Sequence, residues 1–75
     1  MANKTYCCIY RTKDRYEYHV SRLKKEVQQR EALSQSIPIN HPDVDEIVEG
    51  WRRQQREWKL IDINEGFVDW VEGSF

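Results

Sequence analysis

The chain has 75 residues, 33% of them are charged, and the formal net charge at pH 7 is −1. This length suits one small domain over residues 1–75 and leaves little room for an enclosed active site, so we expect neither an enzyme nor a bound cofactor. Because no apolar run is long enough to span a bilayer and residues 1–10 lack a signal-peptide core, we expect a cytoplasmic protein without membrane contact.

The first predicted element is a strand over Lys4–Arg11 (KTYCCIYR), because Tyr, Cys and Ile are common in strands. Cys7 and Cys8 are neighbours, so in a strand their side chains point to opposite faces of the sheet. The chain has no C-x-x-C pair and no H-x(3–5)-H pair, and we therefore expect reduced, structural thiols rather than metal ligands. His19 could serve as the base of a cysteine nucleophile, but the sequence indicates no acid that would orient it.

Residues 12–36 are open to two interpretations, and the one we favour is a long helix. Tyr16, Val20, Leu23 and Val27 are spaced by four, three and four residues, which is the spacing of one helical face. The pattern fades after Val27, where polar residues occupy the same face. We therefore expect a helix whose C-terminal end is frayed.

The second interpretation is a β-hairpin, because the apolar residues of segment 16–20 also alternate with polar ones, as they do in a strand. The turn would then run through residues 12–15, and a shorter helix would follow the second strand. The sequence leaves residues 14–20 open between helix and strand. In the hairpin, the pairs on one face are Ile9 with Tyr18 and Cys7 with Val20, and the helix cap is Ser21.

The segment Pro42–Lys59 carries the clearest pattern in the chain. Its apolar stripe follows the 3.6-residue helical period, and charged residues occupy the opposite side. Pro42 suits a first helical position, acidic residues lie near the start, and arginines lie toward the end. We expect this helix to bury its stripe, both tryptophans included. The stripe comprises Val44, Ile47, Val48, Trp51, Gln55 and Trp58.

After Lys59 the apolar residues alternate, which predicts a strand over residues 58–63. Asn64-Glu65-Gly66 predicts a turn, because glycine adopts a positive φ without strain, and residues 67–72 form the expected return strand. A last helical turn capped by Asn64 is the alternative for this segment. The facing pairs of the predicted hairpin are Ile61 with Trp70, Lys59 with Glu72, and Asp62 with Asp69.

Together these elements predict an α+β fold, namely a helical hairpin of two antiparallel helices, a short N-terminal strand, and a C-terminal β-hairpin or frayed turn. The connector over residues 35–41 is short enough to fold the second helix back on the first. Pro38 and Pro42 prevent one continuous helix across it.

The charges are distributed unevenly, since residues 1–34 carry a net charge of +4 and residues 35–75 carry −5. Aromatic anchors within a charged rim are typical of protein interfaces. We therefore expect a non-catalytic accessory, adaptor or inhibitor that docks on a larger protein, with a homodimer as a further possibility. The predicted partner-binding residues form an acidic, aromatic segment, namely Phe67, Asp69, Trp70, Glu72 and Phe75.

The alternative function is a small nucleic-acid-binding regulator that uses a basic face of residues 11–30. Basic groups with tyrosines nearby suit single-stranded nucleic acid, through phosphate contacts and base stacking. Against this, the chain is not basic overall. The residues of this predicted face are Arg11, Lys13, Arg15, Arg22, Lys24 and Lys25, with Tyr6, Tyr10 and Tyr18 as the neighbouring aromatic residues.

Overall fold

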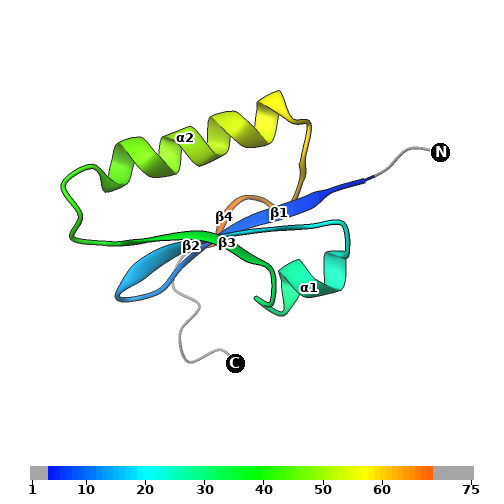
Figure 1. Cartoon of the computed structure of the whole chain (residues 1–75), viewed down its shortest axis with the longest axis horizontal. Coiled ribbons are helices and arrows are strands. Elements are labelled where there is room, and N and C mark those ends of the chain that lie inside the picture. Colours follow the sequence, from blue (N-terminus) through cyan, green and yellow to red (C-terminus); the bar gives the residue numbers. More distant parts are fainter. Residues whose placement is uncertain (1–3, 69–75) are drawn as a thin grey trace.

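A mixed β-sheet separates two helices in the part of the chain that the structure describes (Figure 1). The computed structural model describes the backbone of residues 4–68 and the side chains of residues 4–63. The four strands lie in the spatial order β3-β2-β1-β4; β1 is antiparallel to β2 and parallel to β4, and β2 is antiparallel to β3. In chain order the elements are β1 (Tyr6–Arg11), β2 (Arg15–Ser21), α1 (Lys24–Gln28), β3 (Leu33–Pro38), α2 (Val44–Glu57) and β4 (Ile61–Val68).

The predicted helical hairpin is wrong, because residues 12–36 form β2, the five-residue α1 and the start of β3. A separation of four residues, as between Tyr16 and Val20, fits a helical face and also fits alternate positions of a strand. Pairing with β1 decides in favour of the strand, and the predicted hairpin register is correct, with Ile9 opposite Tyr18. Leu23, which the helical interpretation places in the core, is 61% exposed.

Thr12 closes the β1–β2 turn through its side chain. Its Oγ1 accepts hydrogen bonds from the backbone N–H groups of Asp14 and Arg15, at 3.1 and 3.0 Å. The backbone N–H of Thr12 also donates to the carbonyl of Arg15 at 2.9 Å. A threonine hydroxyl that satisfies two turn amides holds the strands in register even though the turn contains no glycine.

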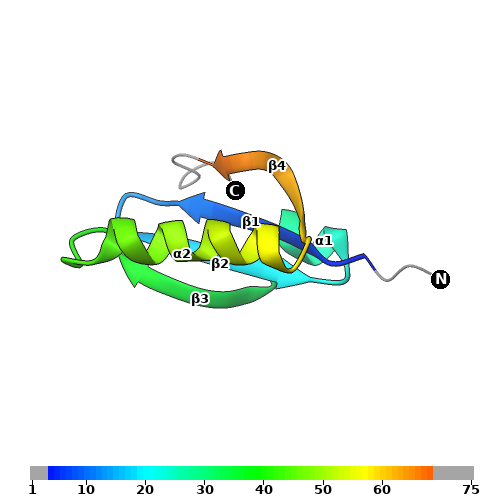
Figure 2. The same ribbon diagram turned by 90° about the horizontal axis from the view of Figure 1, so that it is seen from above.

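The helix predicted from the stripe of Pro42–Lys59 is confirmed as α2, which runs lengthwise over the sheet (Figure 2). Trp51 is buried and stacks on Tyr18, with the ring centroids 5.4 Å apart and an interplanar angle of 15°. Its indole N–H donates to the Gln35 side-chain oxygen at 2.9 Å. The other buried members of this core are Cys7, Ile9 and Ile37.

The prediction that Trp58 is buried is wrong, since its side chain is 62% exposed. The helix ends at Glu57, and Lys59 adopts a left-handed φ of 53° that turns the chain down toward the sheet. The N–H of Leu60 then bonds the carbonyl of Gln55 at 2.9 Å, which is the Schellman pattern of a helix end. Trp58 therefore lies beyond the last residue at which the apolar stripe faces the sheet.

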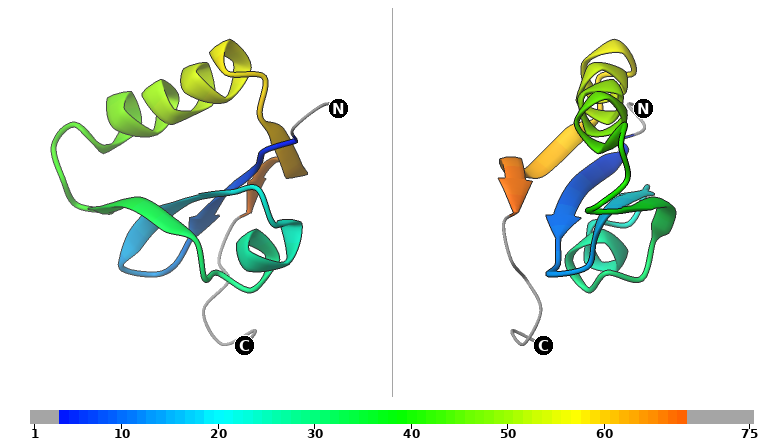
Figure 3. Two further views of the ribbon diagram at one scale, coloured as in Figure 1. Left: turned by 45° about the vertical axis from the view of Figure 1, so that its right-hand side comes forward. Right: turned by 90° about the vertical axis from the view of Figure 1, so that its left-hand side faces the viewer.

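The opposite face of the sheet carries α1 (Figure 3). Its smaller core contains Cys8, Tyr10 and Val27, with Tyr6, Ala32 and Ile63 half-buried around them. Cys7 belongs to the α2 face and Cys8 to the α1 face, so the prediction that the two thiols point to opposite sides is confirmed. Neither forms a disulfide bond, and both are completely buried.

The predicted C-terminal β-hairpin is also wrong, because residues 61–68 form one strand parallel to β1. Ile61 pairs with Tyr6, and Phe67 pairs with Ile9. The register shifts between these pairs, so the segment Asn64-Glu65-Gly66 forms an irregularity inside β4 rather than a turn between two strands. The predicted partners Asp69, Trp70 and Glu72 lie outside the described residues. Within residues 4–68, neither helix is long and apolar enough to cross a membrane.

Candidate functional site

The α1 face of the sheet contains a buried carboxylate, that of Glu17. The pairing of Tyr10 with Glu17 and of Cys8 with His19 places these four side chains on the α1 face. Glu17 is 3% exposed. Its Oε1 lies 3.0 Å from His19 Nε2, and its Oε2 accepts from Arg15 Nε at 2.8 Å. Strand alternation thus turns a charged side chain inward, where it needs charged partners.

Arg30 makes two hydrogen bonds to the carboxylate of Glu17. Its Nε donates to Glu17 Oε1 at 2.9 Å and its Nη2 to Oε2 at 2.8 Å, a bidentate pair. Arg30 follows α1 and has a left-handed φ of 56°, and the N–H of Glu31 bonds the carbonyl of Glu26 at 2.8 Å. This helix end also follows the Schellman pattern, in which glycine is the usual left-handed residue. The backbone strain of a non-glycine residue is offset here by the contacts of its side chain.

The network fixes the protonation states of its members. Burial alone would raise the pKa of Glu17, but hydrogen bonds from Arg30, His19 and Arg15 outweigh it and lower the pKa to about 2. Burial lowers the pKa of His19, although Glu17 opposes this shift. At pH 7 Glu17 is therefore ionised and His19 is neutral, so that Nε2 donates the proton in the hydrogen bond to Glu17.

His19 also packs against Tyr10 in an edge-on arrangement, with the ring centroids 5.2 Å apart. The hydroxyl of Tyr10 donates to the carbonyl of Val27 at 2.7 Å, and burial raises the pKa of this phenol. Nδ1 of His19 is buried and has no hydrogen-bond partner among the described residues. With Nε2 bonded to Glu17, this nitrogen is an acceptor, and leaving it unsatisfied costs roughly 1–3 kcal/mol.

The structure supplies the orienting acid that the sequence did not indicate, because Glu17 bonds His19 and Cys8 lies opposite His19 in the sheet. Cys8 is nevertheless completely buried. It does not line the hollow beside His19. A nucleophile must reach its substrate. The arrangement therefore lacks a substrate route to the thiol in the described part of the chain.

A hollow of about 370 Å³ opens beside this network. It lies between β2, β3 and the segment after α1, so it borders the outer edge of the sheet. Its lining contains two guanidinium groups, one carboxylate, one imidazole, one amide and one aliphatic side chain. The lining residues are Arg15, Glu17, His19, Gln29, Arg30 and Leu33.

A second polar cluster lies under α2, around Cys7. Cys7 pairs with Asp62 across β1 and β4. Burial, and after it the negative charge of Asp62, raises the pKa of the Cys7 thiol to about 12. The Tyr18 hydroxyl and the Gln55 amide nitrogen are buried without partners among the described residues. The thiol is therefore protonated at pH 7, and it behaves as a small core residue.

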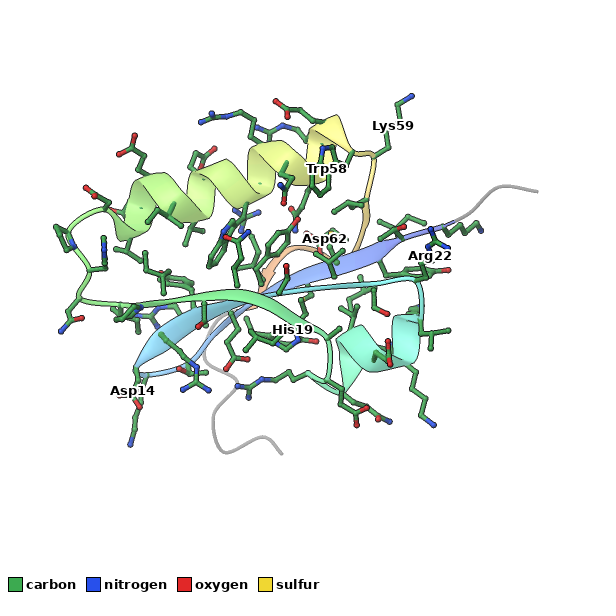
Figure 4. All side chains as sticks on the ribbon, in the orientation of Figure 1. Asp14, His19, Arg22, Trp58, Lys59 and Asp62 are labelled. Atoms are coloured by element: carbon green, nitrogen blue, oxygen red, sulfur yellow. The ribbon has the colours of Figure 1, made fainter. Side chains whose placement is uncertain are left out.

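Exposed apolar side chains gather at the end of the sheet where β1 and β4 begin and β2 ends. Ile61 pairs with Tyr6, which pairs with Ser21, so Ile61 lies two strands across the sheet from the residue at which β2 ends. Trp58 and Lys59 connect α2 to the same end, and Arg22 follows β2 there (Figure 4). We call this surface the basic end, and it comprises Arg22, Leu23, Lys24, Lys25, Trp58, Lys59 and Ile61. Its apolar members, Leu23, Trp58 and Ile61, are 61%, 62% and 40% exposed.

The structure divides the predicted basic face into two groups. Arg11, Lys13 and Arg15 lie at the turn of the hairpin, and Arg22, Lys24 and Lys25 lie at its other end. The seven residues of β2 separate the two groups by about 20 Å. Among the tyrosines of this face, Tyr10 and Tyr18 are buried on opposite sides of the sheet and present no common surface for base stacking.

Most of the predicted partner-binding segment lies outside the residues that the structure describes. Phe67 lies in β4, where the backbone alone is described, and Asp69, Trp70, Glu72 and Phe75 lie outside the described residues. That interface stays a prediction.

Sequence reasoning missed the network of Glu17 and Arg30, as well as the exposure of Trp58. Charged and imidazole side chains at positions 17 and 19 alternate with Tyr16 and Tyr18, a pattern that predicts a strand with one solvated face and not a buried carboxylate. No signal in the sequence pairs Glu17 with Arg30, because that contact depends on where α1 ends.

Comparisons of the chain with family models, curated proteins and solved structures gave no match.

Proposed function

We propose that this chain is a non-catalytic binding protein that docks its basic end on an acidic, partly apolar surface of a larger protein. The observation that carries this proposal is Trp58, a large aromatic side chain that is 62% exposed. Tryptophan is among the residues that contribute most to the binding energy of interfaces. A small domain gains stability from burying each large ring, so an exposed one is a candidate anchor.

The charges around Trp58 indicate the chemistry of the partner. Arg22, Lys24, Lys25 and Lys59 lie toward the same end of the sheet as the exposed apolar side chains; Lys24 and Lys25 belong to α1 on one face, and Lys59 follows α2 on the other. Acidic residues begin α2 at its other end, with Asp45 and Glu46 in its first turn. Complementary charge increases the rate of association and selects the partner, while a buried aromatic anchor slows dissociation.

The buried thiols support binding rather than catalysis in this proposal. Cys7 and Cys8 are both completely buried, and burial raises the pKa of Cys7 to about 12. The proposal also assigns the chain to the cytoplasm, a reducing compartment in which two thiols stay out of disulfide bonds.

A nucleic-acid-binding regulator is the second candidate, favoured by one observation. The basic end combines Arg22, Lys24 and Lys25 with the exposed ring of Trp58, whereas the tyrosines expected to stack on bases are largely buried. One exposed aromatic residue among basic groups can stack on a base while the lysines contact phosphates. The same surface would then serve a different partner.

The test begins with capture of partners by the tagged chain from its host, with and without nuclease. The captured partner is then purified and titrated against Trp58→Ala and against the double variant Lys24→Glu/Lys25→Glu. Lys13→Glu, at the other end of the hairpin, is the matched control for charge. Sedimentation of the isolated chain shows whether the partner is a second copy.

We expect Trp58→Ala to weaken binding at least tenfold, mainly through faster dissociation, because hot-spot residues contribute about 2 kcal/mol or more. The double lysine variant should slow association and reduce its salt dependence, while Lys13→Glu leaves both unchanged. Equal binding by the wild type and Trp58→Ala would reject the basic end as the interface. If nuclease treatment abolishes capture of the partner, the result would favour nucleic acid as the ligand of the basic end.

A further inference from the structure

The hollow beside Glu17 does not belong to the basic end, and its lining has an unusual charge balance. Arg15 and Arg30 each carry one positive charge, Glu17 carries one negative charge, and His19 is neutral at pH 7. The lining therefore has a surplus of one positive charge. The carboxylate of Glu17 balances one of the two positive charges, and its hydrogen bonds hold the guanidinium groups of Arg15 and Arg30 in place.

Arg15 has hydrogen-bonding capacity left after it binds Glu17. Its Nε and Nη2 contact Glu17 Oε2 at 2.8 and 2.6 Å. Its Nη1 takes no partner among the described residues, and its side chain is half-exposed at the rim of the hollow. Guanidinium N–H groups in a fixed orientation favour planar oxyanions such as carboxylates.

The lining of the hollow also includes one apolar side chain. Leu33, the first residue of the edge strand β3, lines the hollow and is 56% exposed. Gln29 also lines the hollow. A ligand that fits this lining has one charged group for Arg15 and a short apolar group for Leu33.

We infer that this hollow binds a small monocarboxylate, with the carboxylate at Arg15 and Arg30 and the apolar group against Leu33. Its volume of about 370 Å³ lies at the lower end of the range for ligand pockets, which excludes large molecules. A dianion such as hydrogen phosphate fits less well, because its second charge exceeds the surplus of the lining and approaches the buried carboxylate of Glu17.

Butyrate is the probe, and its neutral isostere butyramide is the matched control. In a titration followed by amide chemical shifts, we expect butyrate to move the signals of Glu17, Arg30 and Leu33 saturably, with a Kd on the order of 1 mM. Butyramide and inorganic phosphate should each bind at least tenfold more weakly. Shifts that do not saturate, or equal affinity for butyramide, would overturn the site. Equal or tighter binding of phosphate would overturn the assigned ligand class.

Two variants locate the site. Arg15→Gln should weaken butyrate binding about tenfold, as expected for the loss of one charged hydrogen bond. Lys13→Gln removes the same charge two residues away, in the turn, and should leave the affinity within twofold. If Arg15→Gln does not fold, Leu33→Asp places a negative charge on the exposed rim and should abolish binding. An unchanged affinity for butyrate in a folded Arg15→Gln or Leu33→Asp variant would refute the inference. Trp58→Ala is a further control and should leave the affinity for butyrate unchanged.

Discussion

The two faces of the sheet are covered by helices of different length and held by different interactions. The fourteen-residue α2 covers one face with Trp51, which stacks on Tyr18 and packs near Ile9 and Ile37. The five-residue α1 contributes a single fully buried side chain, Val27. Beside the small core of Cys8, Tyr10 and Val27, that face holds Glu17 and its three charged or imidazole partners.

This difference determines how each face responds to perturbation. Apolar burial is non-directional and changes little with pH or salt, so the α2 face depends on the volume of its side chains. A buried carboxylate is stable only while it stays ionised and its hydrogen-bond donors stay correctly placed, so the α1 face depends on the protonation of Glu17 and on geometry. The same geometry leaves a hollow on the α1 face, where a short helix cannot cover the sheet.

The largest effect is expected on the α2 face, from Trp51→Ala. Loss of a buried tryptophan removes its burial energy and leaves a cavity, so the free energy of unfolding should fall by about 3–5 kcal/mol. Trp58→Ala is the matched control, because Trp58 is 62% exposed and its loss should change stability by less than about 0.5 kcal/mol. Urea denaturation measures both. Similar losses for the two variants would contradict the difference in burial.

Acid should destabilise the α1 face next, by about 3 kcal/mol. The pKa of Glu17 falls from 4.5 to about 2 on folding, so its stabilising contribution is present above pH 4.5 and is lost as the pH falls toward 2. The pKa of His19 is also lowered, so its contribution is lost from pH 6.5 downward, where the unfolded chain takes up the proton first. Denaturation curves between pH 7 and pH 2.5 measure both steps.

A matched pair of carboxyl variants isolates the contribution of Glu17. Glu17→Gln should flatten the pH dependence below 4.5, whereas Glu46→Gln, on the exposed side of α2, should leave it unchanged. The network would be shown not to control acid stability if both variants kept the wild-type slope.

A smaller effect separates backbone strain from side-chain contact. Arg30 and Lys59 both have left-handed φ values and both follow a helix, so glycine relieves the same strain at either position. Lys59→Gly should raise the free energy of unfolding by about 0.5–1 kcal/mol. Arg30→Gly should lower it by about 1–2 kcal/mol, because Glu17 loses its bidentate partner. Thermal melts of the two variants measure this difference, and a gain in both would mean that the contact with Glu17 contributes little.

Of the fold, the sequence predicts best what depends on local pattern. The period of α2 extends over four turns, and its buried face needs no knowledge of the remaining chain. The hairpin register of Ile9 with Tyr18 is likewise available from alternation, although the helical spacing of the same segment competes with it. The position of Trp58 is not available, because it depends on the residue at which the helix ends.

The rest depends on contacts between distant residues. β4 pairs with β1, although most of the sequence lies between these two strands. The irregular middle of β4 contains Asn64-Glu65-Gly66, the residues that suggest a turn. The hollow requires β2, β3 and the end of α1 at once. No spacing rule relates Glu17 to Arg30, and the alternation in β2 predicts that Glu17 faces solvent, so neither the burial of this charge nor its partner can be predicted from the sequence.

The placement of β4 also determines the order in which the sheet can open. β4 is an edge strand and joins β1 on one side, and the neighbouring β1–β2 hairpin is closed locally through Thr12. Contacts between residues distant in sequence are entropically the most costly to form, so the pairing of Tyr6 with Ile61 should be the first to open in the native state. In hydrogen exchange, the amides of β4 would then lose protection before those of β2. Such an opening would expose Cys7 beside Asp62, so the rate at which Cys7 reacts with a thiol reagent would report the lifetime of the closed sheet.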